Sequence, residues 1–285
     1  MKVLIAGKSG QLAREFARQL APPAFRVEAP EENELDITHF ETVRAIIGAS
    51  RPDVVLNCAA YNFVDAAEQS PETAFAVNAT GAGNLAAACR EAGAFLIHYS
   101  TDYVFDGLKG APYTEEDAPG PVCAYGQSKL AGERLVAGGM DAYLLLRVSW
   151  VFGDGKQNFF YKMLEAARTH DVLRVVDDQV SVPTSTRDIV RFTMLALDKG
   201  LRGLYHLTNS GFASRYETVR YYFSKLGVSS RLIPVGTDYF PSPARRPRFS
   251  ALSNAKLAAA LDVEIPHWTD GVDWYAERAF TGPTA

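Results

Sequence analysis

Residues 3–13 read VLIAGKSGQLA, a short apolar run that leads directly into a turn with two glycines. The run is typical of a buried strand, and the apolar spacing over residues 10–20 predicts a helix. Gly7 permits a tight turn, and Gly10 lets the backbone approach a pyrophosphate at the helix N-terminus. The chain is therefore predicted to begin with a dinucleotide-binding βα unit.

Apolar runs and segments of helical period alternate through the first half of the chain. This alternation predicts an α/β fold, a Rossmann-type doubly wound parallel sheet. The further strands are expected at 26–29, 53–57, 94–99 and 142–148, and the helices at 40–47, 71–92 and 124–137.

The second half is less regular and predicts a smaller C-terminal substrate-binding lobe. We expect an NAD(P)-binding domain over residues 1–150, which also receives strands and a helix from about 172–208, and a lobe formed mainly by residues 151–285. Helices are predicted at 158–168, 186–197, 253–261 and the C-terminus, and strands at 173–176 and 204–207, around a proline-containing irregular stretch at 237–248.

The composition narrows the classes of function. The 285 residues are 47% hydrophobic and carry a net charge of only −4, which gives no reason to expect a nucleic acid or an anionic membrane as partner. Three cysteines without CxxC spacing predict neither a zinc site nor a disulfide framework. No apolar run is long enough to span a membrane, and the N-terminus is typical of a strand rather than a signal peptide. We expect a cytoplasmic protein.

The segment after the second predicted strand bears on the choice between NADPH and NADH. A carboxylate there would bind a ribose 2′-hydroxyl, whereas basic groups would favour a 2′-phosphate. Glu28, Glu31 and Glu32 lie at this strand end, but Lys8 and Arg14 near the glycine turn could offset them. Both cofactors therefore stay open.

Three residues carry the predicted chemistry. Tyr125 and Lys129 stand at i and i+4, on one face of a predicted helix, and the ammonium is expected to lower the pKa of the phenol so that it can act as an acid. Thr101 follows the fourth predicted strand and can donate to a substrate carbonyl oxygen. Structural explanations, a solvated helix face for the pair and a capped turn for the threonine, remain as alternatives.

With these residues in place, the chain resembles the extended short-chain dehydrogenase/reductases. The resemblance covers nearly the whole chain and rests on the segments GKSGQLA, ELDIT, RPDVVLNCAAYNFVDAAEQSPETAFAVNA, HYSTDYVFDG, PYTEEDAPGPVCAYGQSKLAGE, RVSWVFG, NFFYKML, VVDDQVSVPT, GLYHLTNSG and RRPRFSALSNAKL.

The resemblance implies reduction of the C4 keto group of a nucleotide-sugar by NADPH or NADH, with Thr101, Tyr125 and Lys129 as the catalytic residues. The residues that it implies for the cofactor are Gly7, Ser9, Gly10, Gln11, Leu12, Asp36, Ile37, Ala59, Ala60, Tyr61, Asn78, Tyr125 and Lys129. Those that it implies for the substrate are Thr101, Asp102, Tyr103, Trp150, Asn158, Pro183, Thr184 and Arg246.

Other members of the superfamily give two rival functions. Sugar-nucleotide dehydratases need a second carboxylate beside the threonine, but Asp102 is followed by Tyr103, which favours a reductase over a dehydratase or epimerase. The regulatory subunit of methionine adenosyltransferase resembles the same family, so a non-catalytic binding role stays open. Some members form homodimers bridged by a metal through glutamates. Glu15 matches one of these glutamates, but the others have no clear match here, and we predict no metal.

Overall fold

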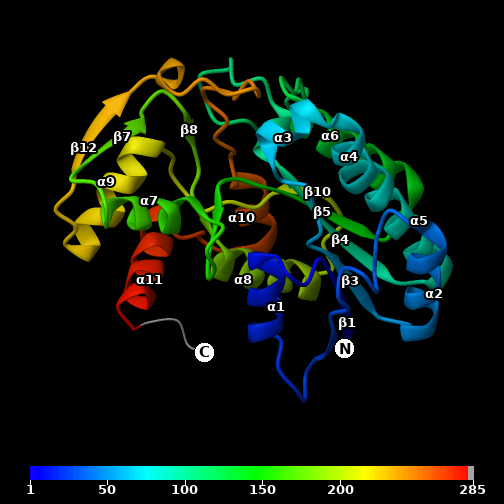
Figure 1. Ribbon diagram of the computed structural model, residues 1–285. Helices are drawn as coiled ribbons and strands as arrows, with labels where there is room; N and C mark the ends of the chain where they lie inside the picture. The colour runs from blue at the N-terminus through cyan, green and yellow to red at the C-terminus, as the bar shows by residue number, and fades with distance from the viewer. Residues whose placement is uncertain (282–285) are drawn as a thin grey trace.

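A six-stranded parallel sheet forms the centre of the protein. The structure, a computed structural model, describes residues 1–281 (Figure 1). The strand order is β10-β5-β4-β3-β1-β2, and every neighbouring pair is parallel. The predicted α/β class is confirmed. The strands are β1 (Lys2–Ala6), β2 (Arg26–Glu28), β3 (Val54–Asn57), β4 (Phe95–Thr101), β5 (Tyr143–Val148) and β10 (Gly203–His206).

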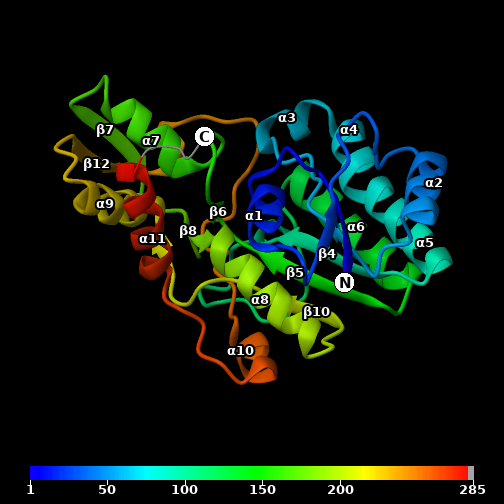
Figure 2. The same ribbon diagram turned by 90° about the horizontal axis from the view of Figure 1, so that it is seen from below.

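Helices cover both faces of this sheet, which is why its central strands contain continuous apolar runs rather than strict alternation. The helices on one face are α1 (Gln11–Gln19), α8 (Thr186–Asp198) and α10 (Ala255–Leu261), and Phe16 and Phe192 are fully buried beneath them. The helices on the other face are α2 (Phe40–Ser50), α5 (Ala82–Ala92) and α6 (Ala124–Gly139). Figure 2 shows α1 and α8 together on their side of the sheet.

The second lobe lies beside the carboxyl ends of the strands. Its strands β7 (Val172–Val176) and β12 (Arg231–Val235) pair with each other in parallel. Around them pack α7 (Phe159–Ala167), α9 (Arg215–Leu226) and α11 (Trp268–Thr281). The lobe has an aromatic core in which the rings of Phe160 and Tyr222 lie 4.9 Å apart.

Two features of this lobe differ from the sequence prediction. Of the strands expected to join the main sheet from residues 172–208, β10 joins it and β7 does not, because β12 supplies the partner for β7. Both α9 and β12 were missed, since aromatic residues on α9 blur its helical period. Short strand pairs connect the lobes: β6 (Val151–Phe152) with β9 (Thr184–Ser185), and β8 (Val180–Ser181) with β11 (Ala213–Ser214).

The long helix predicted over residues 71–92 is interrupted by a wider turn. It consists of α4 (Pro71–Phe75), a π-helical segment η1 (Ala76–Gly81) and α5, and a short helix α3 (Val64–Gln69) precedes it. Two 3₁₀ turns, η2 (Asp102–Val104) and η3 (Thr237–Tyr239), complete the elements. Single-turn π-segments inside helices often occur at functional sites.

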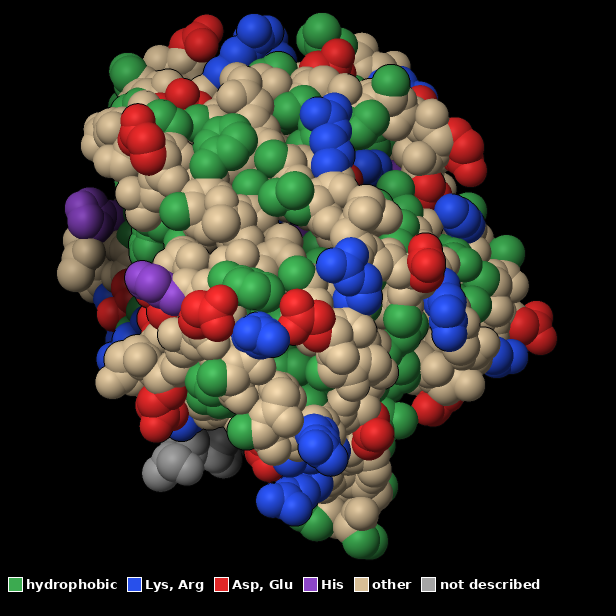
Figure 3. All heavy atoms as spheres, turned by 90° about the vertical axis from the view of Figure 1, so that its right-hand side faces the viewer, with side chains coloured by type: hydrophobic (Ala, Val, Ile, Leu, Met, Phe, Trp, Pro, Cys, Tyr) green, Lys and Arg blue, Asp and Glu red, His purple; other side chains and the backbone are tan. Residues whose placement is uncertain are grey.

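The surface carries mixed charge on the side formed by α2 and α5. Figure 3 shows acidic and basic side chains interspersed there rather than gathered by sign. None of the helices within residues 1–281 is both long and apolar enough to cross a membrane.

Candidate active site

The glycine turn lies at the point where the strand order reverses, between β1 and β3. Gly7 has a φ of +83°, which favours glycine, and a Cβ there would lie 2.5 Å from the Ala59 nitrogen. The turn therefore sits directly against the end of β3. The Gly10 amide donates to the Gly7 carbonyl oxygen at 3.0 Å, and α1 begins one residue later. In an open α/β sheet this reversal point is where ligands bind.

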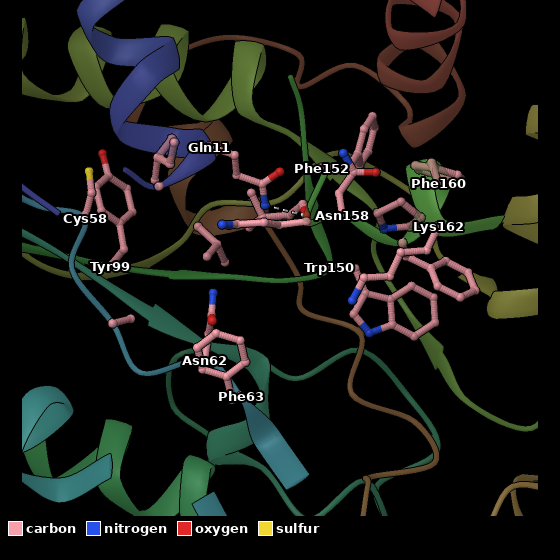
Figure 4. Close-up of a pocket in the computed structure, with 18 of the residues that line it drawn as sticks. Gln11, Cys58, Asn62, Phe63, Tyr99, Trp150, Phe152, Asn158, Phe160 and Lys162 are labelled. Carbon is pink, nitrogen blue, oxygen red and sulfur yellow. Dashed lines mark hydrogen bonds between the residues drawn. The ribbon is translucent and has the colours of Figure 1, made fainter. Parts of the chain in front are cut away.

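A cavity of about 570 Å³ opens at this point and runs between the two lobes. In Figure 4, Cys58 and Tyr99 lie at one end of it and Trp150 and Lys162 at the other. The predicted site residues that line the cavity are Gly10, Gln11, Leu12, Ala60, Tyr125, Lys129, Trp150, Asn158 and Pro183.

Tyr125 and Thr101 meet beside this cavity. Tyr125 is the second residue of α6 and Thr101 the last of β4, and the Thr101 hydroxyl makes a polar contact with the phenol. Burial raises the pKa of Tyr125 above its ordinary value, and the contact with Thr101 only partly offsets this. The phenol is therefore protonated at neutral pH and holds a proton that it can donate.

The predicted effect of Lys129 on this phenol is not found. The Lys129 Nζ instead donates to the Tyr99 carbonyl oxygen at 2.6 Å, because the flexible side chain extends toward β4. Burial lowers the pKa of Lys129 to about 8, and the nearby Glu133 opposes that shift. The i, i+4 spacing places both residues on one helix face, but burial rather than their mutual charge determines the pKa of Tyr125.

The first turn of α1 fits a pyrophosphate. The first N–H groups of a helix have no intrahelical partners and attract anions. Gln11, at the first position, donates from Nε2 to the Val151 carbonyl oxygen at 3.1 Å, as drawn in Figure 4. Its Oε1 is buried without a hydrogen-bond partner. An unpaired buried acceptor beside open N–H groups indicates a ligand that carries both hydrogen-bond donors and negative charge.

Carboxylates border the other side of the glycine turn. Glu31 forms an ion pair with Lys8, and the Ser9 hydroxyl donates to Glu32. Glu28 accepts from the Ser50 hydroxyl at 2.6 Å. Of the basic and acidic groups that the sequence left in balance, Lys8 and Glu31 pair with each other, whereas Arg14 donates to the backbone oxygens of Ser9 and Asp154.

Other predicted cofactor residues are not among those that line the cavity. Asp36 accepts from the Thr38 amide at 2.9 Å, and Ile37 packs against Gly81. The buried Asn78 donates to Ser128 at 2.9 Å and exchanges two hydrogen bonds with the Tyr61 backbone. These contacts hold the elements around the cavity in place.

Some of the predicted substrate residues line the cavity, and others bind neighbouring segments of the chain instead. Thr184 is fully buried and donates to the Val182 carbonyl oxygen at 3.1 Å. Arg246 donates to Asp65 at 2.7 Å instead of entering the cavity. The Tyr103 ring packs edge-on against Tyr125, with ring centres 5.8 Å apart.

Asp102 is a buried link between the lobes. Its carboxylate accepts from the hydroxyls of Thr101, Ser181 and Ser250, the last two of which lie outside the N-terminal 150 residues. Burial raises the pKa of Asp102 above its ordinary value, although these hydrogen bonds oppose the shift. With three hydroxyl partners, this carboxylate serves as an anchor.

Arg215 is a cavity residue that the sequence reasoning missed. Its guanidinium lies 3.6 Å from the centre of the Trp150 ring and 4.8 Å from that of Phe159, and it contacts the Tyr103 side chain. Trp150 is held at a φ of +39°, a strained conformation for a non-glycine residue. The sequence does contain a signal for the helix that carries Arg215: Ser214 and Glu217 have the spacing of a capping box, and they form one at the start of α9.

Comparisons with known proteins agree with this geometry. The family model described as "RmlD substrate binding domain" matches residues 1–280. A curated dTDP-4-dehydrorhamnose reductase from Burkholderia thailandensis is 40% identical, with 94% of this chain and 95% of the relative covered. A solved dTDP-4-dehydrorhamnose reductase from Clostridium acetobutylicum superposes with a TM-score of 0.94 at 38% identity, covering 97% of this chain and 99% of the other. A Bacillus anthracis reductase, solved in complex with NADP, also gives 0.94, at 33% identity, with 96% and 98% covered.

Proposed function

Because the chain belongs to the RmlD substrate-binding-domain family, we propose that it is an NAD(P)H-dependent oxidoreductase that reduces the C4 keto group of dTDP-4-dehydrorhamnose, giving dTDP-L-rhamnose. The observation that carries this proposal is the partly buried, protonated Tyr125 in contact with Thr101, at a cavity that begins at the N-terminus of α1. The substrate is inferred from membership of the family, and the type of reaction is inferred from the residues of the site.

Tyr125 and Thr101 act on the oxygen of the keto group. When bound, a reduced nicotinamide supplies the hydride. As hydride reaches the carbon, negative charge grows on the oxygen, and the Thr101 hydroxyl, which donates to Asp102 in this structure, would turn to donate a hydrogen bond to it. Tyr125 transfers its proton to that oxygen, which completes the alcohol.

Lys129 and the start of α1 would hold the cofactor. The Lys129 ammonium has three donors, and its one hydrogen bond to Tyr99 leaves two for ribose hydroxyls. The N–H groups of Gln11 and Leu12 would bind the pyrophosphate.

The far end of the cavity would hold the nucleotide-sugar. The Arg215 guanidinium offers a fork of hydrogen-bond donors suited to a diphosphate, and partial burial lowers its pKa because it removes water from around the charge. Lys156 and Lys162 line the same end of the cavity. Trp150 offers an apolar ring against which a sugar face can pack.

A coupled assay tests the reaction. The 4-keto-6-deoxy nucleotide-sugar is generated in situ, and oxidation of NADPH and of NADH is followed by absorbance. We expect turnover with at least one of the two and dTDP-L-rhamnose as the product. If neither is oxidised, the substrate is wrong, and a non-catalytic binding role gains weight.

The Tyr125→Phe variant tests the proton donor. Removal of the hydroxyl leaves the ring packing against Tyr103 intact but takes away the proton, so we expect kcat to fall at least about a hundredfold. Cofactor affinity, measured by fluorescence titration, serves as the control and is expected to be the same as in the wild type. Near-normal turnover would remove Tyr125 from the mechanism.

The dehydratase alternative loses support in this geometry. A dehydratase would need a second acid beside the threonine, but Asp102 is bound by three hydroxyls and Tyr103 follows it. Burial raises the pKa of Tyr103 to about 12, so this phenol is not a base near neutral pH. One proton donor beside one polarising hydroxyl is sufficient for a reduction.

A further inference from the structure

The direction of the Tyr125 side chain depends on how α6 begins. Tyr125 is the second residue of this helix, where N–H groups lack intrahelical partners and the first turn tends to fray. Most helices cap this end with a side-chain oxygen at the N-cap. Here the N-cap is Cys123, whose sulfur is a weak acceptor. An N-cap side chain accepts from the second or third N–H of the helix, so the first N–H, that of Ala124, needs an acceptor from another part of the chain.

Glu68 supplies that cap from α3. Its Oε1 accepts from the Ala124 amide at 2.7 Å, across 56 residues of sequence. A carboxylate at this end also interacts favourably with the helix dipole. The contact lies one residue before Tyr125, so it restrains the backbone from which the phenol projects.

Two contacts outside α6 hold α3 in place. Asp65 accepts from the Arg246 guanidinium at 2.7 Å and from the Ala244 amide at 3.3 Å. Ala67 is fully buried in a small cluster that includes Ala124. Because α3 is anchored on both sides, Glu68 is a fixed acceptor rather than a mobile surface side chain.

We propose that Glu68 is a positioning residue for Tyr125, acting by capping α6 so that the phenol stays directed at Thr101. This inference rests on the proposed role of Tyr125 as proton donor. Loss of the cap lets the first turn open, which misdirects the phenol without removing it. A small misplacement of a reacting group costs rate far more than it costs binding.

Variants at Glu68 separate this role from a general loss of structure. In Glu68→Ala we expect kcat to fall about tenfold, with KM values for both substrates within about twofold of normal. Glu68→Gln keeps an oxygen that can accept from Ala124 and should restore most of kcat. Glu72→Ala, at an exposed carboxylate on the neighbouring α4, is the matched control and should leave kcat unchanged.

Two results would overturn the proposal: a normal kcat in Glu68→Ala, or a Glu68→Gln variant as slow as Glu68→Ala. Tyr125→Phe is assayed in parallel. If Tyr125→Phe is slow and Glu68→Ala is normal, the capping role alone fails, whereas a fast Tyr125→Phe overturns the proposed function itself.

Hydrogen exchange tests the same contact in the unmodified protein, should Glu68→Ala fail to fold. The Ala124 amide is expected to exchange as slowly as the amides in the middle of α6, since it is hydrogen-bonded although it lies in the first turn. Rapid exchange at Ala124 would show that Glu68 does not cap the helix and would overturn the proposal.

Discussion

Lys129 shows how burial determines the charge of a single residue at the candidate site. Its sequence position indicated a partner for Tyr125, but a sequence gives no measure of desolvation, so the direction of the Tyr125 pKa shift was not predictable. Conversely, the pairing of Tyr125 with Thr101 was predictable, because both follow from motif position at the ends of predicted elements. Arg215 was not predictable as a site residue, because the sequence pattern did not indicate α9, the helix that begins with it.

The ionisation of Lys129 predicts a pH dependence. Burial favours the uncharged amine, so the proton is present below a pKa of about 8 and is lost above it. We therefore expect kcat/KM for the cofactor to fall by up to about tenfold per pH unit above that value. The residual activity of Lys129→Met, which cannot ionise, should not change with pH across the same window. A wild-type profile that stays level to about pH 10 would contradict the assignment.

At the scale of elements, α6 is held by close backbone approach as well as by side chains. Gly132 packs directly against the Asn78 carbonyl oxygen in the π-helical segment η1, and an added Cβ would overlap that oxygen. Gly138, on the same helix, has open space where a Cβ would lie. Close packing therefore requires a glycine at position 132, whereas it leaves room for a side chain at position 138.

This difference predicts opposite effects of the same substitution. Gly132→Ala should destabilise the protein by about 1–3 kcal/mol, because backbone atoms must move to make room. Gly138→Ala should be neutral or stabilising by up to about 1 kcal/mol, because alanine favours the helix. Urea unfolding measures both. Equal effects at the two positions would show that the approach to Asn78 is not a tight one.

Most main-sheet strands were predictable because each contains a continuous apolar run, and α6 was predictable because it follows such a strand and carries the Tyr125–Lys129 spacing. The π-segment was not, since nothing in the local pattern of residues 76–81 distinguishes it from ordinary helix. The association of β7 with β12 depends on contacts between segments more than fifty residues apart, and local periodicity carries no information about such pairing.

At the scale of the whole molecule, the chain passes repeatedly between the lobes, and one of these crossings is fixed by an ion pair. The segment after β12 runs from the second lobe toward α3, as Figures 1 and 2 show, and Arg246 binds Asp65 there. The pair is partly buried, so it is expected to contribute more than an exposed pair does.

Loss of this pair should loosen the crossing segment. In Asp65→Asn we expect trypsin to cut after the exposed Arg245 about fivefold faster, because cleavage follows the population of locally opened chain. Glu91→Gln removes an exposed pair with Arg44 elsewhere on the surface and serves as the control. Cleavage at the wild-type rate in Asp65→Asn would mean that other contacts hold the segment.

The strand order also has a consequence for synthesis on the ribosome. The first five strands of the sheet are complete by residue 148, but α8, which covers one face, begins at residue 186, and the edge strand β10 ends at residue 206. Until that length of chain has emerged, apolar strand surface and an unpaired edge remain exposed. We expect nascent chains of intermediate length to need chaperones, and truncation near residue 150 to give an aggregating fragment rather than an independent cofactor-binding domain.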